Sequence, residues 1–191
     1  MPVIRVSDAT FVDLKTVAVW LGTSKPGETI QRLVAEKMDE LGMERDIDES
    51  SEPVSENSLV RNFVKTPGLS FTRVLAASVG GQALERPNWQ KLLLNTIREL
   101  KGRGFGVDQI VAELQVPSTT KPRSDQGYKY ISDLGISIQG QSAPDAWKEV
   151  SRLAEKFSIE VYVKFQWRAN PKAQHPGEIG EMKIQRKTPA A

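Results

Sequence analysis

The chain has 191 residues, with 26 basic and 24 acidic side chains, one histidine and no cysteine. The absence of cysteine excludes disulfides and thiolate chemistry, which fits a reducing cytoplasm. No apolar run reaches the length of a membrane span, and no basic stretch with an apolar block follows the first residue, so we expect neither a membrane segment nor a secretory signal. A lone histidine is also a poor ligand set, so we expect no metal and no cofactor.

The first 43 residues predict one short strand followed by two helices. In the strand PVIRVS, alternation puts Ile4 and Val6 on one face, with Val3, Arg5 and Ser7 on the other. Apolar residues then recur at three- and four-residue steps over two further segments, which predicts two amphipathic helices. The first apolar stripe comprises Phe11, Leu14, Val17, Ala18 and Leu21, and the second comprises Ile30, Leu33, Val34, Met38 and Leu41.

Capping residues set the limits of both helices. Ser7 or Asp8 can begin the first helix, and Gly22 can end it in the left-handed conformation. Pro26 fits the first turn of the second helix, where no amide hydrogen is needed, and Gly42 can end that helix.

Two apolar stripes and a strand face are more apolar surface than about forty residues can cover alone. Domains of this size need a partner, a metal or disulfides. With no cysteine and a single distant histidine, a second copy is the remaining solution. We therefore expect a homodimer through residues 2–43, in which two strands pair antiparallel. The alternative is an ordinary helical hairpin that packs against the rest of the chain.

The sequence IRVS, the Gly22-Thr23-Ser24 turn and the apolar spacing make residues 2–43 resemble the ribbon-helix-helix family of bacterial DNA-binding proteins. In that family the paired strands enter the major groove, and the start of the second helix holds phosphate. A helix start suits this role because its free amides and positive dipole end attract anions. The resemblance implies base contacts from Val3, Arg5 and Ser7 and phosphate contacts from Thr23, Ser24 and Lys25.

The opening IRVSDATFVDL is also similar to the N-terminal part of the bacterial negative modulators of replication initiation. In those proteins this part associates with itself, and a separate C-terminal domain reads DNA. Residues 1–45 carry a net charge of −1, which is unfavourable for a surface that contacts phosphate. The sequence leaves open whether the segment reads DNA or only dimerises.

Charge is distributed unevenly over the remaining residues. Residues 44–58 are acidic, rich in serine and without periodicity, and they predict a linker. The net charge is −5 for residues 46–59 and +8 for residues 60–191. A basic region of that size suits a polyanionic partner such as DNA. We expect residues 188–191 to be a disordered tail.

Residues 59–187 predict a second domain, so the chain as a whole is expected to be α+β: an N-terminal ribbon-helix-helix dimerisation module and a C-terminal domain with a small, mostly antiparallel sheet and packed helices. Helices are expected near residues 89–101, 107–114 and 143–158. Strands are expected near residues 69–81, 127–141, 159–169 and 180–185. Alternation between Ile159 and Arg168 predicts one apolar and one polar strand face.

Two basic regions of this domain are candidate DNA contacts. The loop 117–130 holds Lys121, Arg123 and Lys129, interleaved with two tyrosines that can stack on an exposed base. Lys164 and Arg168 share one face of a strand. The alternative for the loop is a solvated segment whose tyrosines pack on the sheet.

The sequence therefore predicts a cytoplasmic bacterial homodimer that binds DNA, either a transcriptional repressor or a DNA-organising regulator, and not an enzyme. One alternative is an interaction adaptor, dimerised by its N-terminal module, whose C-terminal domain binds another protein. A second is a metal-dependent nuclease that uses Pro144-Asp145 with Glu181-Met182-Lys183, since acids can hold magnesium while a lysine assists the attacking water.

Overall fold

A computed structural model describes residues 3–43 and 60–185. Within these residues the chain is α+β, as predicted, with five helices, one five-stranded sheet and one three-stranded sheet. Two compact units are present, Met1–Asp39 and Glu40–Ala191. The predicted linker at 44–58 and the predicted tail at 188–191 lie outside the described residues.

The N-terminal unit contains α1 (Asp8–Leu21) and most of α2 (Pro26–Leu41), which confirms both predicted helices. The Ser7 hydroxyl caps α1 by accepting a hydrogen bond from the Thr10 amide at 3.2 Å. Gly22 ends α1 with a φ of 63°, where a side chain would be strained. Residues 3–7 form no strand in the described chain, so the strand predicted there is not observed.

Hydroxyl groups define the turn between α1 and α2. The Thr23 and Thr29 hydroxyls lie 2.7 Å apart, and the Thr29 hydroxyl also donates to the Lys25 carbonyl at 3.2 Å. The Arg32 guanidinium donates to the Leu21 carbonyl at the end of α1. Thr29 is buried, so its hydrogen bonds satisfy a polar group that would otherwise lose free energy on leaving water.

The larger sheet has the order β1-β8-β7-β2-β3. Among its described strands only β1 and β8 pair in parallel, so the predicted antiparallel character is confirmed. In β7, buried apolar residues alternate with half-buried ones, as the sequence predicted. The strands are β1 (Val60–Asn62), β2 (Thr72–Val79), β3 (Gln82–Ala83), β7 (Val161–Trp167) and β8 (Ile179–Ile184).

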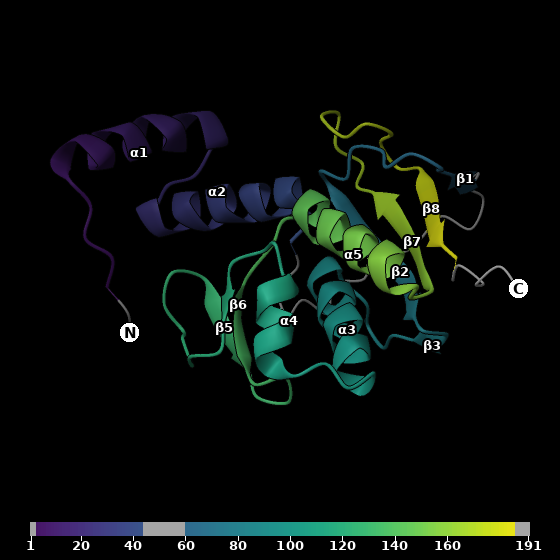
Figure 1. Ribbon diagram of the computed structural model, residues 1–191. Helices are drawn as coiled ribbons and strands as arrows, with labels where there is room; N and C mark the ends of the chain where they lie inside the picture. Colours follow the sequence, from purple (N-terminus) through teal and green to yellow (C-terminus); the bar gives the residue numbers. More distant parts are fainter. Residues whose placement is uncertain (1–2, 44–59, 186–191) are drawn as a thin grey trace, which may run out of the picture. The chain divides into compact units, whose positions relative to one another are not determined.

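Three helices follow the predicted ranges: α3 (Trp89–Gly102), α4 (Val107–Glu113) and α5 (Ala143–Phe157). Asn88 and Ser142 cap α3 and α5 with their side-chain oxygens. Helices α3 and α5 pack against each other and cover one face of the larger sheet (Figure 1). The other face of that sheet carries the polar residues of β7 and β8.

The smaller sheet has the order β4-β6-β5, formed by β4 (Ser118–Thr119), β5 (Tyr128–Ile131) and β6 (Ile136–Gln139). The single strand predicted over residues 127–141 is wrong, because the chain reverses between β5 and β6 at Gly135, whose φ is 73°. In Figure 1 the helices lie between this sheet and the five-stranded one.

Three buried indoles hold the segment that leads into β2. Each indole N–H donates to an oxygen of residues 66–72, at 2.8 to 3.1 Å. These bonds satisfy the indole donors and fix the path of the chain as it enters β2. The pairs are Trp89 with the Thr72 hydroxyl, Trp147 with the Thr66 hydroxyl and Trp167 with the Gly68 carbonyl.

Candidate nucleic-acid interface

Val3, Arg5 and Ser7, the predicted base-contacting residues, are all exposed. Ser7 has a structural role as the cap of α1, and its hydroxyl also lies 2.8 Å from that of Thr10. A base contact from Ser7 would therefore compete with the helix cap. The other two predicted base-contacting residues, Val3 and Arg5, precede α1 and its cap in the chain.

Thr23, Ser24 and Lys25 immediately precede α2, and the carboxylate of Glu28 lies close to two of them. The Ser24 hydroxyl donates to Glu28 at 3.5 Å, and the Lys25 ammonium is 3.8 Å from the same carboxylate. Both charged groups are largely exposed, so the ion pair is weak. The sequence prediction missed Glu28, although a glutamate three residues after Lys25 on a helix indicates an ion pair between the two side chains.

Helix α1 presents apolar side chains around its whole circumference and has no buried residue along its described length. Val19 is 81% exposed and Trp20 is 88% exposed. A helix that is apolar on all sides is normally covered by other elements. The sequence prediction assigned α1 a single stripe and missed Trp20, which lies outside that stripe.

The loop before β5 holds Arg123 in a fixed position. Its guanidinium forms two hydrogen bonds with Asp125, at 2.9 and 2.7 Å, and lies 4.3 Å above the ring of Tyr128. The hydrogen bond from Arg123 lowers the pKa of Asp125 and, in return, raises the pKa of Arg123. Sequence reasoning found Arg123 but missed Asp125, its partner two residues along the chain.

A buried hydroxyl anchors the same loop to β6. The Ser137 hydroxyl donates to the Lys121 carbonyl at 2.9 Å and accepts from the Arg123 amide at 2.8 Å. These bonds hold the backbone of Lys121 and Arg123 against β6, whereas Lys129 lies in β5 and is paired with Ile138. Tyr130, one of the two predicted stacking tyrosines, is 42% exposed.

The polar face of the larger sheet alternates in charge and is not a basic patch. Lys164 on β7 lies 3.8 Å from Glu181 on β8, and Lys183 lies 3.2 Å from Glu160. Partial burial, with a smaller contribution from a hydrogen bond to Glu181, raises the pKa of Tyr162 to about 12. Paired charges of opposite sign weaken the attraction of this face for phosphate.

Arg168 lies just beyond the end of β7, where its amide donates to the Phe71 carbonyl at 2.7 Å. Lys164 is in β7 of the five-stranded sheet and Arg168 follows that strand. Lys121 and Arg123 are in the loop between β4 and β5 of the three-stranded sheet, and Lys129 is in β5. Helices separate the two sheets (Figure 1). The structure does not unite the two predicted basic regions.

The residues of the nuclease alternative lie apart in the fold. Asp145 is in the first turn of α5, where it is bonded to Ser142, whereas Glu181 and Lys183 are on the polar face of β8. Helix α5 packs on the opposite, apolar face of that sheet. Within the described residues no three acidic or histidine side chains are grouped to hold a metal ion.

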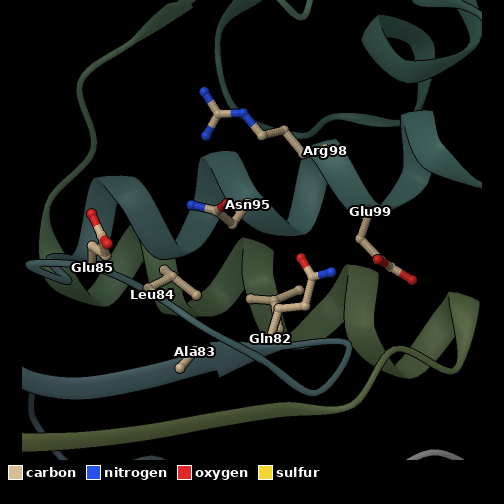
Figure 2. A pocket seen from close by; sticks show the side chains of 8 residues that line it. Gln82, Ala83, Leu84, Glu85, Asn95, Arg98 and Glu99 are labelled. Atoms are coloured by element: carbon tan, nitrogen blue, oxygen red, sulfur yellow. The ribbon is translucent and has the colours of Figure 1, made fainter.

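A small polar cavity of about 270 Å³ lies between β3 and α3 (Figure 2). Gln82, Asn95, Arg98 and Glu99 are among its lining residues. Arg98 is 2.7 Å from Asp133, and Glu99 is 2.9 Å from Arg103. Because Arg98 and Glu99 are each paired with a residue that does not line the cavity, we assign it no chemistry.

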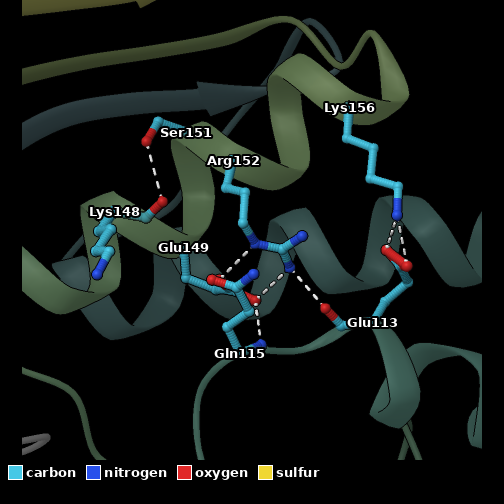
Figure 3. Close-up of polar contacts among 7 residues, drawn as sticks. All are labelled: Glu113, Gln115, Lys148, Glu149, Ser151, Arg152 and Lys156. Carbon is cyan, nitrogen blue, oxygen red and sulfur yellow. Dashed lines mark hydrogen bonds and ion pairs between the residues drawn. The ribbon is translucent and has the colours of Figure 1, made fainter.

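A buried carboxylate connects α4 to α5 (Figure 3). Glu149 is 3% exposed, and it accepts two bonds from Arg152, at 3.0 and 2.8 Å, and one from the Gln115 amide at 2.9 Å. Arg152 also donates to the Glu113 carbonyl at 2.6 Å. The hydrogen bond to Glu149 is the main cause of the raised pKa of Arg152. Every partner is internal, so this network stabilises the fold.

In the part of the chain that the structure describes, no helix combines the length and the apolar character needed to cross a membrane. Comparison with models of protein families, with curated proteins and with solved structures gives no match. The geometry described above is therefore the basis for a functional proposal.

Proposed function

We propose that the chain is a homodimeric DNA-binding protein, a cytoplasmic bacterial repressor or DNA-organising regulator that dimerises through residues 2–43. The observation that carries the proposal is the exposure of apolar side chains on both N-terminal helices. They include Phe11, Val12, Val19, Trp20, Leu33 and Val34. While this area stays in water it contributes nothing to the stability of a single copy. Burying it against a second copy would stabilise the fold by about 25 cal/mol for each Å².

Pairing of two copies also accounts for residues 3–7, which are not in a strand in the single chain. An antiparallel pair of these segments would satisfy their backbone groups and present Val3 and Arg5 on one face. The face fits the major groove in the manner that the ribbon-helix-helix resemblance implies.

The charge of residues 60–191 supports contact with a polyanion. Residues 60–191 carry a net charge of +8. Lys121 is exposed at the end of the smaller sheet. In a dimer two such regions act on the same DNA molecule, so weak contacts gain from effective concentration.

Sedimentation and DNA binding by the full chain test this proposal. We expect a dimer at micromolar concentration and an affinity for random duplex that falls steeply with salt, because phosphate contacts release counterions. Leu33→Glu should dissociate the dimer and weaken DNA binding, while Gln31→Glu, which adds the same charge at an exposed position of α2, should do neither. A well-folded monomer would contradict the proposal.

One observation favours the adaptor as the second candidate. Arg123 and Lys164 are both paired with carboxylates of the same chain, so they contribute less to a field that attracts phosphate. If the dimer forms but duplex affinity is weak and insensitive to salt, a protein partner of the C-terminal unit becomes the better account.

A further inference from the structure

Arg123 has few donors left for an anion, but its side chain remains partly exposed. Nε and one terminal nitrogen donate to Asp125, and that terminal nitrogen also lies 3.0 Å from the Gln126 side-chain oxygen. A guanidinium recognises phosphate or a guanine edge through this same fork of donors. One flat face rests on the Tyr128 ring, while the side chain remains 34% exposed. A ligand that stacks on this side chain would therefore take the opposite face.

The loop is organised before any ligand binds. The fully buried hydroxyl of Ser137 holds the backbone of Lys121 and of Arg123. The Gln139 side chain donates to the Gln126 carbonyl at 2.8 Å, which fastens the other end of the loop to β6. A ligand that stacks on Arg123 would not have to order the loop, so less of the binding free energy is lost.

A second planar group lies on the same face of β5. Tyr130 follows Tyr128 by two residues, so both side chains lie on one side of the sheet. Its cross-strand partner is Ser137, the residue that anchors the loop, which places the exposed ring of Tyr130 beside it. The Arg123 guanidinium and the Tyr130 ring together form what we call the stacking surface.

We propose that the stacking surface binds the unpaired bases of single-stranded DNA. The inference rests on the proposed DNA-binding function and names the form of DNA that the C-terminal unit takes. In a duplex the faces of the bases are stacked on each other, so only their edges and the phosphates are accessible. In a single strand the faces are exposed, and they stack on aromatic rings and guanidinium planes. Lys121 supplies an exposed cation for the backbone of the strand.

Fluorescence anisotropy with the full chain tests the proposal, using a labelled oligothymidine and a labelled random duplex. Arg123→Lys keeps the charge and removes the plane, so it should weaken oligothymidine binding about tenfold, within the range measured for base stacking. Duplex binding should stay within about twofold, because its phosphate contacts depend on charge. Lys148→Ala, which removes an exposed cation on α5, is the matched control and should not change the preference for either form of DNA.

Tyr130 gives a second test that does not depend on the Arg123 contacts. Tyr130→Leu should cause the same selective loss, and Tyr130→Trp should restore binding, because a larger ring keeps the stacking surface. If these variants lose affinity equally for both forms of DNA, or for neither, the inference is overturned. The proposed function would still stand in that case, provided that the wild type binds duplex. If the wild type binds neither form, both proposals fail.

Discussion

Gly180 on β8 lies directly against Phe165, its cross-strand partner on β7. A Cβ added at Gly180 would stand 2.6 Å from Cζ of Phe165 and 3.1 Å from Phe63. The first distance is too short for carbon atoms and the second is tight, and the Phe165 ring cannot move easily because it is fully buried within the core. The glycine is therefore required by packing, and not by its backbone conformation.

We expect Gly180→Ala to lower the free energy of unfolding by about 1–3 kcal/mol, the usual cost of overpacking a core. Gly102→Ala, at the end of α3, is the matched control because an added Cβ there meets no atom within 4 Å. Urea denaturation of both variants measures the difference. An unchanged midpoint for Gly180→Ala would show that the rings relax at no cost.

Removing the buried carboxylate of Glu149 should destabilise the C-terminal unit. Glu149→Ala leaves the Gln115 amide and the Arg152 guanidinium without their acceptors, and breaking a buried pair costs about 3 kcal/mol or more. Glu155→Ala, at an exposed position of the same helix, should change stability by less than about 0.5 kcal/mol. Thermal unfolding followed by circular dichroism distinguishes these outcomes, and equal melting temperatures would refute the assigned role.

Acid should weaken the connection between α3 and the turn that joins β5 and β6. The hydrogen bond from Arg98 lowers the pKa of Asp133, so folding favours the charged form of this carboxyl. The resulting stability is present above the ordinary aspartate pKa of about 4 and is lost as the pH falls through the lower value in the folded state. Asp133→Asn should be less stable than the wild type at neutral pH, and its stability should fall less than that of the wild type on acidification.

The direction of this pH dependence is tested by the urea midpoints of Asp133→Asn and of the wild type, measured at a series of acid pH values. The two curves should converge as the pH falls. Arg98→Gln should reproduce the effect, because it removes the same pair from the other side. Parallel curves across the acid range would show that the pair does not couple to folding.

The sequence predicted the elements of this fold better than their pairing. Periodicity placed α3, α5 and β7 correctly because each has a continuous apolar face. The β5–β6 hairpin was missed because its turn interrupts an otherwise strand-like run for only a few residues. The parallel pairing of β1 with β8 joins segments more than a hundred residues apart, so no local pattern records it.

At the candidate site too, the sequence predicted residues that form a local pattern and missed a contact between segments that are distant in the chain. Arg123 and the tyrosines were found because basic and aromatic residues alternate along the loop. The anchor, Ser137, was not found because its hydroxyl meets the loop only after β6 has folded back. The exposed Trp20 was missed because it lies outside the apolar stripe that predicts the helix.

Substitution of Arg5 distinguishes between an N-terminal unit that reads DNA and one that only dimerises. If paired segments read bases, Arg5→Ala should remove about 1–3 kcal/mol of discrimination between a preferred and a random duplex, both identified by selection with the full chain. Arg5→Lys should lose most of the same discrimination, because a point charge cannot replace a bidentate fork. Binding that is unchanged by Arg5→Ala and abolished by combined substitution of Lys164 and Arg168 would instead make the N-terminal unit a dimerisation element and the C-terminal unit the reader of DNA.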